Sequence, residues 1–285
     1  MSLLEQIMDT GYSSETTFGK ALISAWRQRV IRALVSPPSR LPWPGHPGKL
    51  ELDAATNRLN TLHDYLEGVD MILRQRYGVP HLHNVRDPLA ELLLIVLSRK
   101  TPEDAYLRAF HRLLQSHDSW EDIHHMEEDE LQDMVEDGGL ASKKVTAIRG
   151  MLTTIHDTFG EYSLESLEQM SDQDVLKFLA SLDEVGPKSA LCVMMYALER
   201  PAFPVDAHVG RFLTRLGIFT VLGLDLGALD HKQKQRYLQD LVPPELRYSL
   251  HVNALMIGRE LCPASSPSCE DCPLSDRCYT GLQRV

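Results

Sequence analysis

Residues 182–190 read LDEVGPKSA, a short turn between two helical patterns. Gly186 can adopt a positive φ, and Pro187 suits the first position of a helix. The following helix therefore begins with free backbone N–H groups at the positive end of its dipole, an arrangement that binds anions such as phosphate. Most turns of this kind only connect two helices, so the signal is weak by itself.

Lys188 stands in the first turn of the second helix, where the helix dipole repels a cation. The commonest position of a lysine is on the solvated surface. The alternative is a nucleophilic amine, because dipole repulsion and partial burial would both lower its pKa, as Schiff-base chemistry requires.

Residues 203–211 read FPVDAHVGR and open the next helical pattern. Asp206 suits the N-cap of that helix, where its carboxylate accepts a backbone hydrogen bond. A capping carboxylate is fixed in place and could also face Lys188, so the cap does not exclude a chemical role. His208 is better explained as a packed histidine with one hydrogen bond than as a catalytic group.

The rest of the chain predicts helices almost throughout, which makes the fold class all-α. Residues 89–98 form a continuous apolar run, and we favour a buried helix there because no alternating strand pattern exists to pair with it. Ser171 resembles a helix N-cap. Apolar spacing predicts further helices over 15–35, 54–77, 102–115, 127–136, 143–159, 163–170, 172–182, 188–197, 209–216, 232–241 and 246–260.

Residues 1–54 are predicted to be an appendage to the main body, consisting of a helix and a Pro-rich linker. Residues 36–48 read SPPSRLPWPGHPG, and their five prolines exclude a helix and predict a semi-rigid linker.

The composition is that of a globular protein, with 43% hydrophobic and 24% charged residues, which excludes a mostly disordered chain. No apolar run approaches the roughly 18 residues that span a bilayer. The first residues lack the basic and apolar pattern of a secretory signal. We therefore expect a cytoplasmic protein without a membrane partner.

The net charge of −11 argues against nonspecific binding of nucleic acids, which needs local positive charge. The charge is unevenly distributed, however. Residues 118–137 hold ten carboxylates and no lysine or arginine, whereas residues 206–285 hold nine acidic and nine basic residues. The negative charge is therefore mostly one acidic surface.

Four of the five cysteines, Cys262, Cys269, Cys272 and Cys278, fall within 17 residues at spacings of six, two and five residues. Four thiolates in one loop can surround a zinc ion or an iron–sulfur cluster. Zinc sites usually pair two short Cys knuckles, and only one is present, so the spacing favours a [4Fe–4S] cluster. Cys192 lies in an apolar helical pattern and is predicted to pack in the core.

The hairpin with Lys188, the segment with Asp206 and the cysteine loop follow one another in this order. With this arrangement, residues 55–285 resemble endonuclease III and its relatives, the helix–hairpin–helix DNA glycosylases that carry an iron–sulfur cluster. The segments VGPKSA and VDAH, the cysteine loop and the spacing from Lys188 to Asp206 all fit this family. The resemblance implies two helical lobes with a DNA-binding cleft between them. Residues 85–205 would form a helical barrel lobe with the hairpin, and residues 55–84 with 206–285 would form the cluster lobe.

The resemblance also implies a base-excision repair enzyme, a bifunctional DNA glycosylase and AP lyase that removes oxidised pyrimidines from duplex DNA. Lys188 would expel the base, form a Schiff base and cut the strand by β-elimination. Asp206 would stabilise positive charge on the sugar and help to deprotonate the amine. The four cysteines would hold a structural [4Fe–4S] cluster. We expect a monomer in the bacterial nucleoid that binds double-stranded DNA with a damaged base or an abasic site.

The DNA contacts implied by the resemblance lie on three segments. Val185 and Gly186 belong to the hairpin. Leu140 matches a position that enters the gap left by the flipped base, although a loop anchor explains it equally well. Lys143 and Lys144 could contact phosphate or simply be a solvated helix start. The last contact is Lys100, which stands where the family commonly has a glutamine.

Glu184 departs from the family pattern, because the hairpin usually begins with a glycine. A carboxylate beside a phosphate site weakens binding unless it points away. Residues 263–268 are uncharged, whereas relatives often carry basic residues there. Together with Lys100, these departures predict weak DNA affinity and slow turnover, and the change Glu184→Gly is expected to tighten duplex binding.

Two other functions stay open on the same scaffold. The first is a monofunctional glycosylase for another lesion, in which Lys188 is idle. The second is a weakly active protein that binds DNA or a partner, which the acidic balance and Glu184 favour mildly. The presence of Lys188 and Asp206 at the family's spacing argues against the second.

Overall fold

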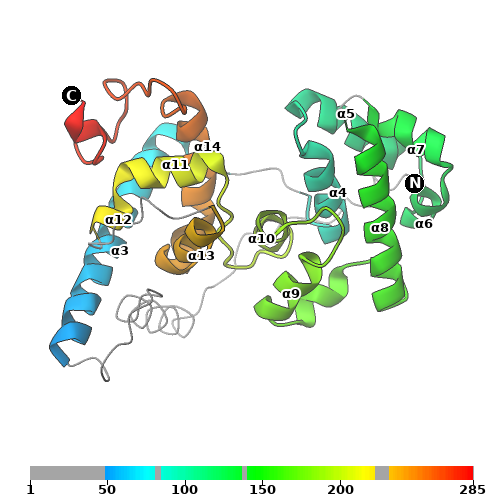
Figure 1. The fold of residues 1–285 in the computed structure, drawn as a ribbon, viewed down its shortest axis with the longest axis horizontal. Coiled ribbons are helices and arrows are strands. Elements are labelled where there is room, and N and C mark those ends of the chain that lie inside the picture. The colour runs from blue at the N-terminus through cyan, green and yellow to red at the C-terminus, as the bar shows by residue number, and fades with distance from the viewer. Residues whose placement is uncertain (1–48, 81–84, 137–139, 222–230, 285) are drawn as a thin grey trace. The chain divides into compact units, whose positions relative to one another are not determined.

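The computed structural model describes residues 49–80, 85–136, 140–221 and 231–284. The regular structure in these residues is entirely helical, without a strand, which confirms the predicted all-α fold (Figure 1). The helix predicted over 15–35 and the Pro-rich linker lie outside the described residues. No described helix is both long enough and apolar enough to cross a membrane.

The chain divides into two units. Among the described residues, the first unit holds 85–200 and the second holds 49–80 together with 201–284. The chain thus changes unit after residue 200, against a predicted lobe boundary after residue 205. The assignment of the hairpin and cluster roles to two lobes stays a prediction.

The first unit is built around helix α4 (Pro88–Ser98), which contacts α5, α8 and α10. Helices on several sides bury α4, and this explains why its sequence is apolar almost throughout. Asp87 caps α4 and accepts from the backbone N–H groups of Leu89 and Ala90, both at 2.8 Å. The other helices of the unit are α5 (Glu103–Gln115), α6 (Trp120–His125), α7 (Glu128–Val135), α8 (Ala141–Phe159), the 3₁₀ helix η2 (Glu165–Gln169), α9 (Asp172–Leu179) and α10 (Pro187–Tyr196).

The second unit packs helix α14 (Arg247–Glu260) against α3 (Lys49–Tyr77) and α11 (Ala207–Leu216). Polar groups also join α3 to α14. Arg74 donates to Asp70 at 2.6 Å and to Ser249 at 2.8 Å, and Ser249 donates to Asp70 at 2.7 Å. The remaining helices are α12 (Ile218–Val221), α13 (His231–Leu241) and the 3₁₀ helices η3 (Pro244–Leu246) and η4 (Gly281–Gln283).

Most of the predicted helices are confirmed, with ends shifted by a few residues. The segment predicted over 163–170 forms the short 3₁₀ helix η2, and α6 and α12 were not predicted. Helix α6 buries Trp120 and Ile123, but six residues are too few to show helical spacing. Ser171 caps α9 as predicted and accepts from the N–H of Asp174 at 3.2 Å. Cys192 is 2% exposed, which confirms its place in the core.

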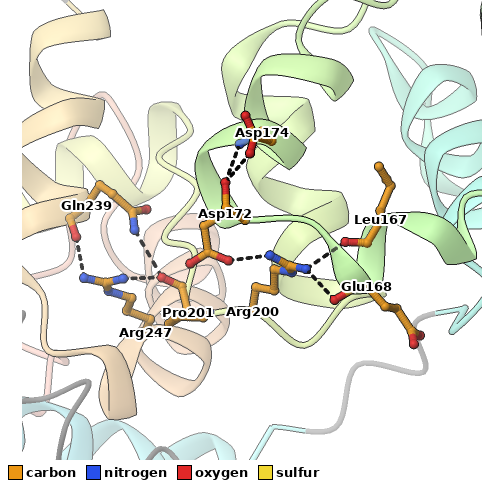
Figure 2. A network of polar contacts seen from close by, with 9 residues as sticks. Leu167, Glu168, Asp172, Asp174, Arg200, Pro201, Gln239 and Arg247 are labelled. Carbon is orange, nitrogen blue, oxygen red and sulfur yellow. Dashed lines mark hydrogen bonds and ion pairs between the residues drawn. The ribbon is translucent and has the colours of Figure 1, made fainter. Parts of the chain in front are cut away.

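The chain crosses from the first unit to the second between Arg200 and Pro201, and polar contacts hold each of these residues (Figure 2). Arg200 closes the first unit, and its guanidinium donates to Asp172 at 2.6 Å. Pro201 opens the second unit, and its carbonyl accepts from Arg247 and, at 3.1 Å, from Gln239. Two consecutive residues are therefore each anchored within their own unit.

Candidate functional site

The hairpin between α9 and α10 differs from the prediction in its backbone. Gly186 has a φ of −82°, so the expectation of a positive φ at this glycine is wrong. Instead, Glu184 occupies the left-handed region with a φ of 64°. Val185 is 4% exposed, so only its backbone can contact DNA. The turn is closed by the N–H of Val185, which donates to the carbonyl of Leu182 at 3.1 Å.

Lys188 stands in the first turn of α10, immediately after Pro187 at the start of the helix, as predicted. Its side chain is exposed, so the expected partial burial is wrong for this structure. Gly186 is the N-cap and offers no side-chain acceptor. The N–H groups of the first turn therefore keep no capping partner of their own and can bind an anion from outside.

Asp206 caps α11, as predicted, and its Oδ1 accepts from the N–H of Val209 at 2.8 Å. The cap uses Oδ1, so Oδ2 is available to a second donor. His208 is a packed histidine, as predicted, with Nδ1 at 3.0 Å from the Arg211 guanidinium. Asp206 belongs to the second unit and Lys188 to the first, so their pairing stays a prediction.

A cavity of about 370 Å³ lies beside Asp206 within the second unit. Three cationic side chains line it, namely Arg211, Arg215 and Lys234. The sequence reasoning missed these residues. The two arginines lie on one face of α11 and could have been found from helical spacing, whereas Lys234 comes from α13 and could not.

The four clustered cysteines line a single cavity in the second unit, so the fold brings together all the predicted ligands. No three Cys, His, Asp or Glu side chains in the described residues lie so that they could hold one metal ion. The donor set consists of four thiols, which is the chemistry that a zinc ion or an iron–sulfur cluster takes, so the choice between them stays a prediction.

The surroundings of the cysteine loop favour neutral thiols. Burial raises the pKa of the Cys272 and Cys278 thiols, and the neighbouring cysteines raise it further. A bound cationic centre would be needed to hold all four as thiolates.

Helix α11 connects Asp206 to the cysteine loop. Arg211 donates to the Cys262 carbonyl at 2.9 Å. One turn later, Arg215 donates to Cys262 Sγ at 3.2 Å and to the Pro263 carbonyl at 2.6 Å. The helix that fixes the candidate acid–base carboxylate at its start is thus held by the cysteine loop along its length.

Four of the six predicted DNA-contact residues line one pocket of the first unit, which we call the basic pocket, whereas Val185 and Gly186 do not line it. Its volume is about 80 Å³. It gathers four cationic side chains around one carboxylate, although no single segment of the sequence contains them all. The lining residues are Val96, Arg99, Lys100, Leu140, Lys143, Lys144, Ala147 and Glu184.

The two neighbouring lysines of the basic pocket differ sharply. Lys143 is exposed, which fits either of its predicted roles. Lys144 is 4% exposed, so a solvated helix start does not describe it. Its ammonium donates to Thr101 Oγ1 at 2.6 Å, and burial lowers its pKa. Leu140, by contrast, is 48% exposed and begins α8 with a φ of 57°.

Known proteins resemble this chain over most of its length. Endonuclease III of Thermotoga maritima is 25% identical over 199 residues, which is 70% of this chain and 86% of that protein. A candidate DNA glycosylase of Arabidopsis thaliana is 31% identical over 193 residues, covering 64% of each chain. The chain thus covers less than two thirds of that relative, and only 9% of Protein ROS1A of Oryza sativa subsp. japonica. No protein-family model matches the sequence.

Solved structures show the same fold. A trapped covalent intermediate of endonuclease III with DNA gives a TM-score of 0.63 at 24% identity and covers 79% of this chain and 98% of that chain. A non-covalent endonuclease III–DNA complex gives a TM-score of 0.61 at 25% identity, covering 79% and 97%. The similarity in sequence and in fold together supports the endonuclease III family of helix–hairpin–helix DNA glycosylases.

Proposed function

We propose that this protein is a bifunctional DNA glycosylase and AP lyase of base-excision repair, acting on oxidised pyrimidines in duplex DNA. The observation that carries the proposal is the position of Lys188 in the first turn of α10, beside N–H groups that have no capping side chain. A phosphate bound at those N–H groups would place the neighbouring sugar within reach of the amine.

The chemistry divides between Lys188 and Asp206. The carboxylate of Asp206 accepts a proton from the ammonium, and the neutral amine attacks C1′ of the flipped nucleotide. The bond from C1′ to the base breaks, and the base leaves with the electron pair. The ring oxygen then leaves C1′ with the electron pair of their bond and takes a proton from the attacking nitrogen, which gives a protonated Schiff base. Removal of a C2′ proton expels the 3′ phosphate, which cuts the strand.

We further propose that Cys262, Cys269, Cys272 and Cys278 hold a [4Fe–4S] cluster with a structural role. Bound iron would supply the positive charge that lets four thiolates share one cavity. The protein's own contribution is to position the loop, chiefly through Arg215 and its bonds to Cys262 Sγ and the Pro263 carbonyl. A brown protein with four irons per chain is the expected result of purification, and stoichiometric zinc would contradict the assignment.

Borohydride trapping tests the catalytic proposal directly. Wild-type protein is mixed with duplexes that contain an oxidised pyrimidine or an abasic site, and the Lys188→Gln variant is treated in parallel. A covalent adduct that forms with wild type and disappears in Lys188→Gln is expected. Lys177→Gln is a matched control, because Lys177 is also exposed but lies on α9, and this variant should still form the adduct.

Other outcomes of this experiment point to the alternative functions. Base release without an adduct would indicate a monofunctional glycosylase. Duplex binding without base release or an adduct would indicate a binding protein. The lesion range is measured in the same assay with a further set of duplexes that differ only in the damaged base and in the base opposite it.

A further inference from the structure

Backbone strain is concentrated at the basic pocket. Five residues other than glycine have a positive φ in the described part of the chain, namely Lys100, Leu140, Glu184, Glu199 and Ser266. The first three all line this pocket. A left-handed conformation is unfavourable for residues with a Cβ, and such residues gather where function requires a particular backbone shape.

Glu184 combines this strain with a charge in an unfavourable place. Its φ of 64° would suit a glycine, and its carboxylate lies two residues before the N-cap of α10. An uncompensated carboxylate at this position would repel a phosphate that approaches the first turn of the helix.

Arg99 compensates for both problems with one guanidinium group. Its Nη1 donates to the backbone carbonyl of Glu184 at 2.9 Å and also to the Glu184 carboxylate. Arg99 is the C-cap that follows α4, and its N–H donates to the Val96 carbonyl at 3.4 Å. The hydrogen bond from Arg99 holds the pKa of Glu184 below its usual value, so the carboxylate is ionised.

We propose that Arg99 is the positioning residue of the hairpin, because it holds Glu184 in its left-handed conformation and neutralises its carboxylate. The start of α10 then stays open to a DNA phosphate although Glu184 replaces a glycine. This inference rests on the proposed function. It also changes the expectation from the sequence, because a neutralised Glu184 weakens DNA binding little.

A double-mutant cycle on duplex binding tests this proposal. The ligand is a duplex with a tetrahydrofuran abasic-site analogue, and the variants are Arg99→Ala, Glu184→Gly and the double variant. Arg99→Ala is expected to weaken binding about tenfold, because it leaves the negative charge of the Glu184 carboxylate without its ion-pair partner. Glu184→Gly and the double variant should both stay within about twofold of wild type, since neither keeps an unpaired carboxylate.

The decisive comparison is the double variant against Arg99→Ala. If Arg99 contacts a phosphate itself, the double variant will bind as weakly as Arg99→Ala, and the proposal is overturned. Arg108→Ala is the charge-matched control. Arg108 pairs with Asp104 at 2.8 Å on α5, outside the basic pocket, so its loss should change affinity by less than about twofold.

Thermal unfolding separates the conformational effect from the charge effect and needs no DNA. Arg99→Ala should lower the unfolding midpoint, and adding Glu184→Gly should restore it, because glycine adopts a positive φ without support. Adding Glu184→Gln to Arg99→Ala should restore binding but not the midpoint, since glutamine removes the charge and keeps the strain.

The unfolding measurements also distinguish failure of this inference from failure of the proposed function. Suppose that wild type neither binds nor traps DNA, while Glu184→Gly still restores the midpoint that Arg99→Ala lowers. The proposed function then fails, and the role of Arg99 in holding Glu184 stands. If wild type binds DNA and the effects of Arg99→Ala and Glu184→Gly on the midpoint simply add, the role of Arg99 is refuted and the proposed function is unaffected.

Discussion

Helices α10 and α11 begin in opposite ways. At α10 the N-cap is Gly186, which has no side chain to bond the N–H groups of the first turn. At α11 the N-cap is Asp206, whose own carboxylate accepts from Val209. The first helix start is thus prepared for an anion from outside, whereas the second is satisfied by the protein and fixes a carboxylate for another purpose.

Under the proposed function, one local motif therefore serves two roles. A helix start that caps itself gains stability, and one that lacks a cap gains a binding site at a cost in stability. Helix α11 is also tied to the cysteine loop through Arg211 and Arg215. We infer that precise placement matters most at Asp206, and access matters most at Lys188.

The largest expected effect follows the change Asp206→Asn. Asparagine caps a helix as well as aspartate does, so the fold should be unchanged. Base removal should fall by about 10²–10⁴-fold, the usual contribution of an acid–base group. Single-turnover release of an oxidised pyrimidine measures the rate, and thermal unfolding checks the cap.

A rate for Asp206→Asn within about threefold of wild type would reduce Asp206 to a helix cap. Asp206→Ala is the useful companion variant. It removes the cap as well, so it should lower the free energy of unfolding by about 1 kcal/mol where Asp206→Asn does not.

The change Gly186→Asp makes α10 resemble α11 and should have the next largest effect. An added Cβ meets no atom within 4 Å, so the substitution fits. The new carboxylate should cap α10 and stabilise the protein by a few tenths of a kcal/mol. Duplex affinity, measured by fluorescence anisotropy, should fall at least about tenfold, because the anion site is now occupied.

Gly186→Asn separates the cap from the charge. It should stabilise α10 to a similar degree and weaken binding less than Gly186→Asp does. Equal affinities for wild type and Gly186→Asp would show that DNA does not use the start of α10.

The third effect concerns the other end of α11. Arg215→Lys keeps the charge but loses the planar group that reaches Cys262 Sγ, the Pro263 carbonyl and the Ala264 carbonyl. The free energy of unfolding should fall by about 2 kcal/mol, and the brown colour should fade faster in air. Arg236→Lys, at an exposed position on α13, is the matched control. Unchanged colour and stability would mean that Arg215 does not support the loop.

The smallest effect is expected for Tyr65→Phe. The Tyr65 hydroxyl lies 3.0 Å from the Leu216 carbonyl at the end of α11 and 2.8 Å from the Arg277 carbonyl, and its single hydrogen is shared between these two acceptors. Its loss should cost about 1 kcal/mol of unfolding free energy. Exposed Tyr279→Phe is the control and should leave the unfolding free energy unchanged.

The pH dependence gives a second test of Tyr65. Burial raises its pKa to about 12 from an ordinary value of 10.0, so the folded state favours the neutral phenol. This stabilisation is present below pH 10 and is lost as the pH rises towards 12. Wild type should therefore lose more stability than Tyr65→Phe over this range, and parallel losses would contradict the raised pKa.

Local signals in the sequence were enough to predict the helix starts. Pro187 and Asp206 act within one turn of the chain, so their roles could be read from their neighbours alone. The positive φ at Glu184 could not be predicted, because Arg99 supports it from 85 positions away. The burial of Lys144 depends in the same way on Thr101, 43 positions away.

The cysteine loop shows which part of a site its own sequence can predict and which part it cannot. Their spacing predicted one shared site, and the four side chains do line one cavity. The arginines that hold the loop come from α11, which the spacing does not reveal.

The order of the helices along the chain has a consequence for synthesis on the ribosome. Helix α3 is made before the first unit, yet its packing partners α11 and α14 are made after it. At about 5–20 residues per second, the roughly 60 residues from Pro201 to Glu260 take about 3–12 s to translate. During this delay the first unit can already fold, while the apolar face of α3 has no helix to pack against. Nascent chains that stall before α14 should therefore expose α3 to chaperones and proteases.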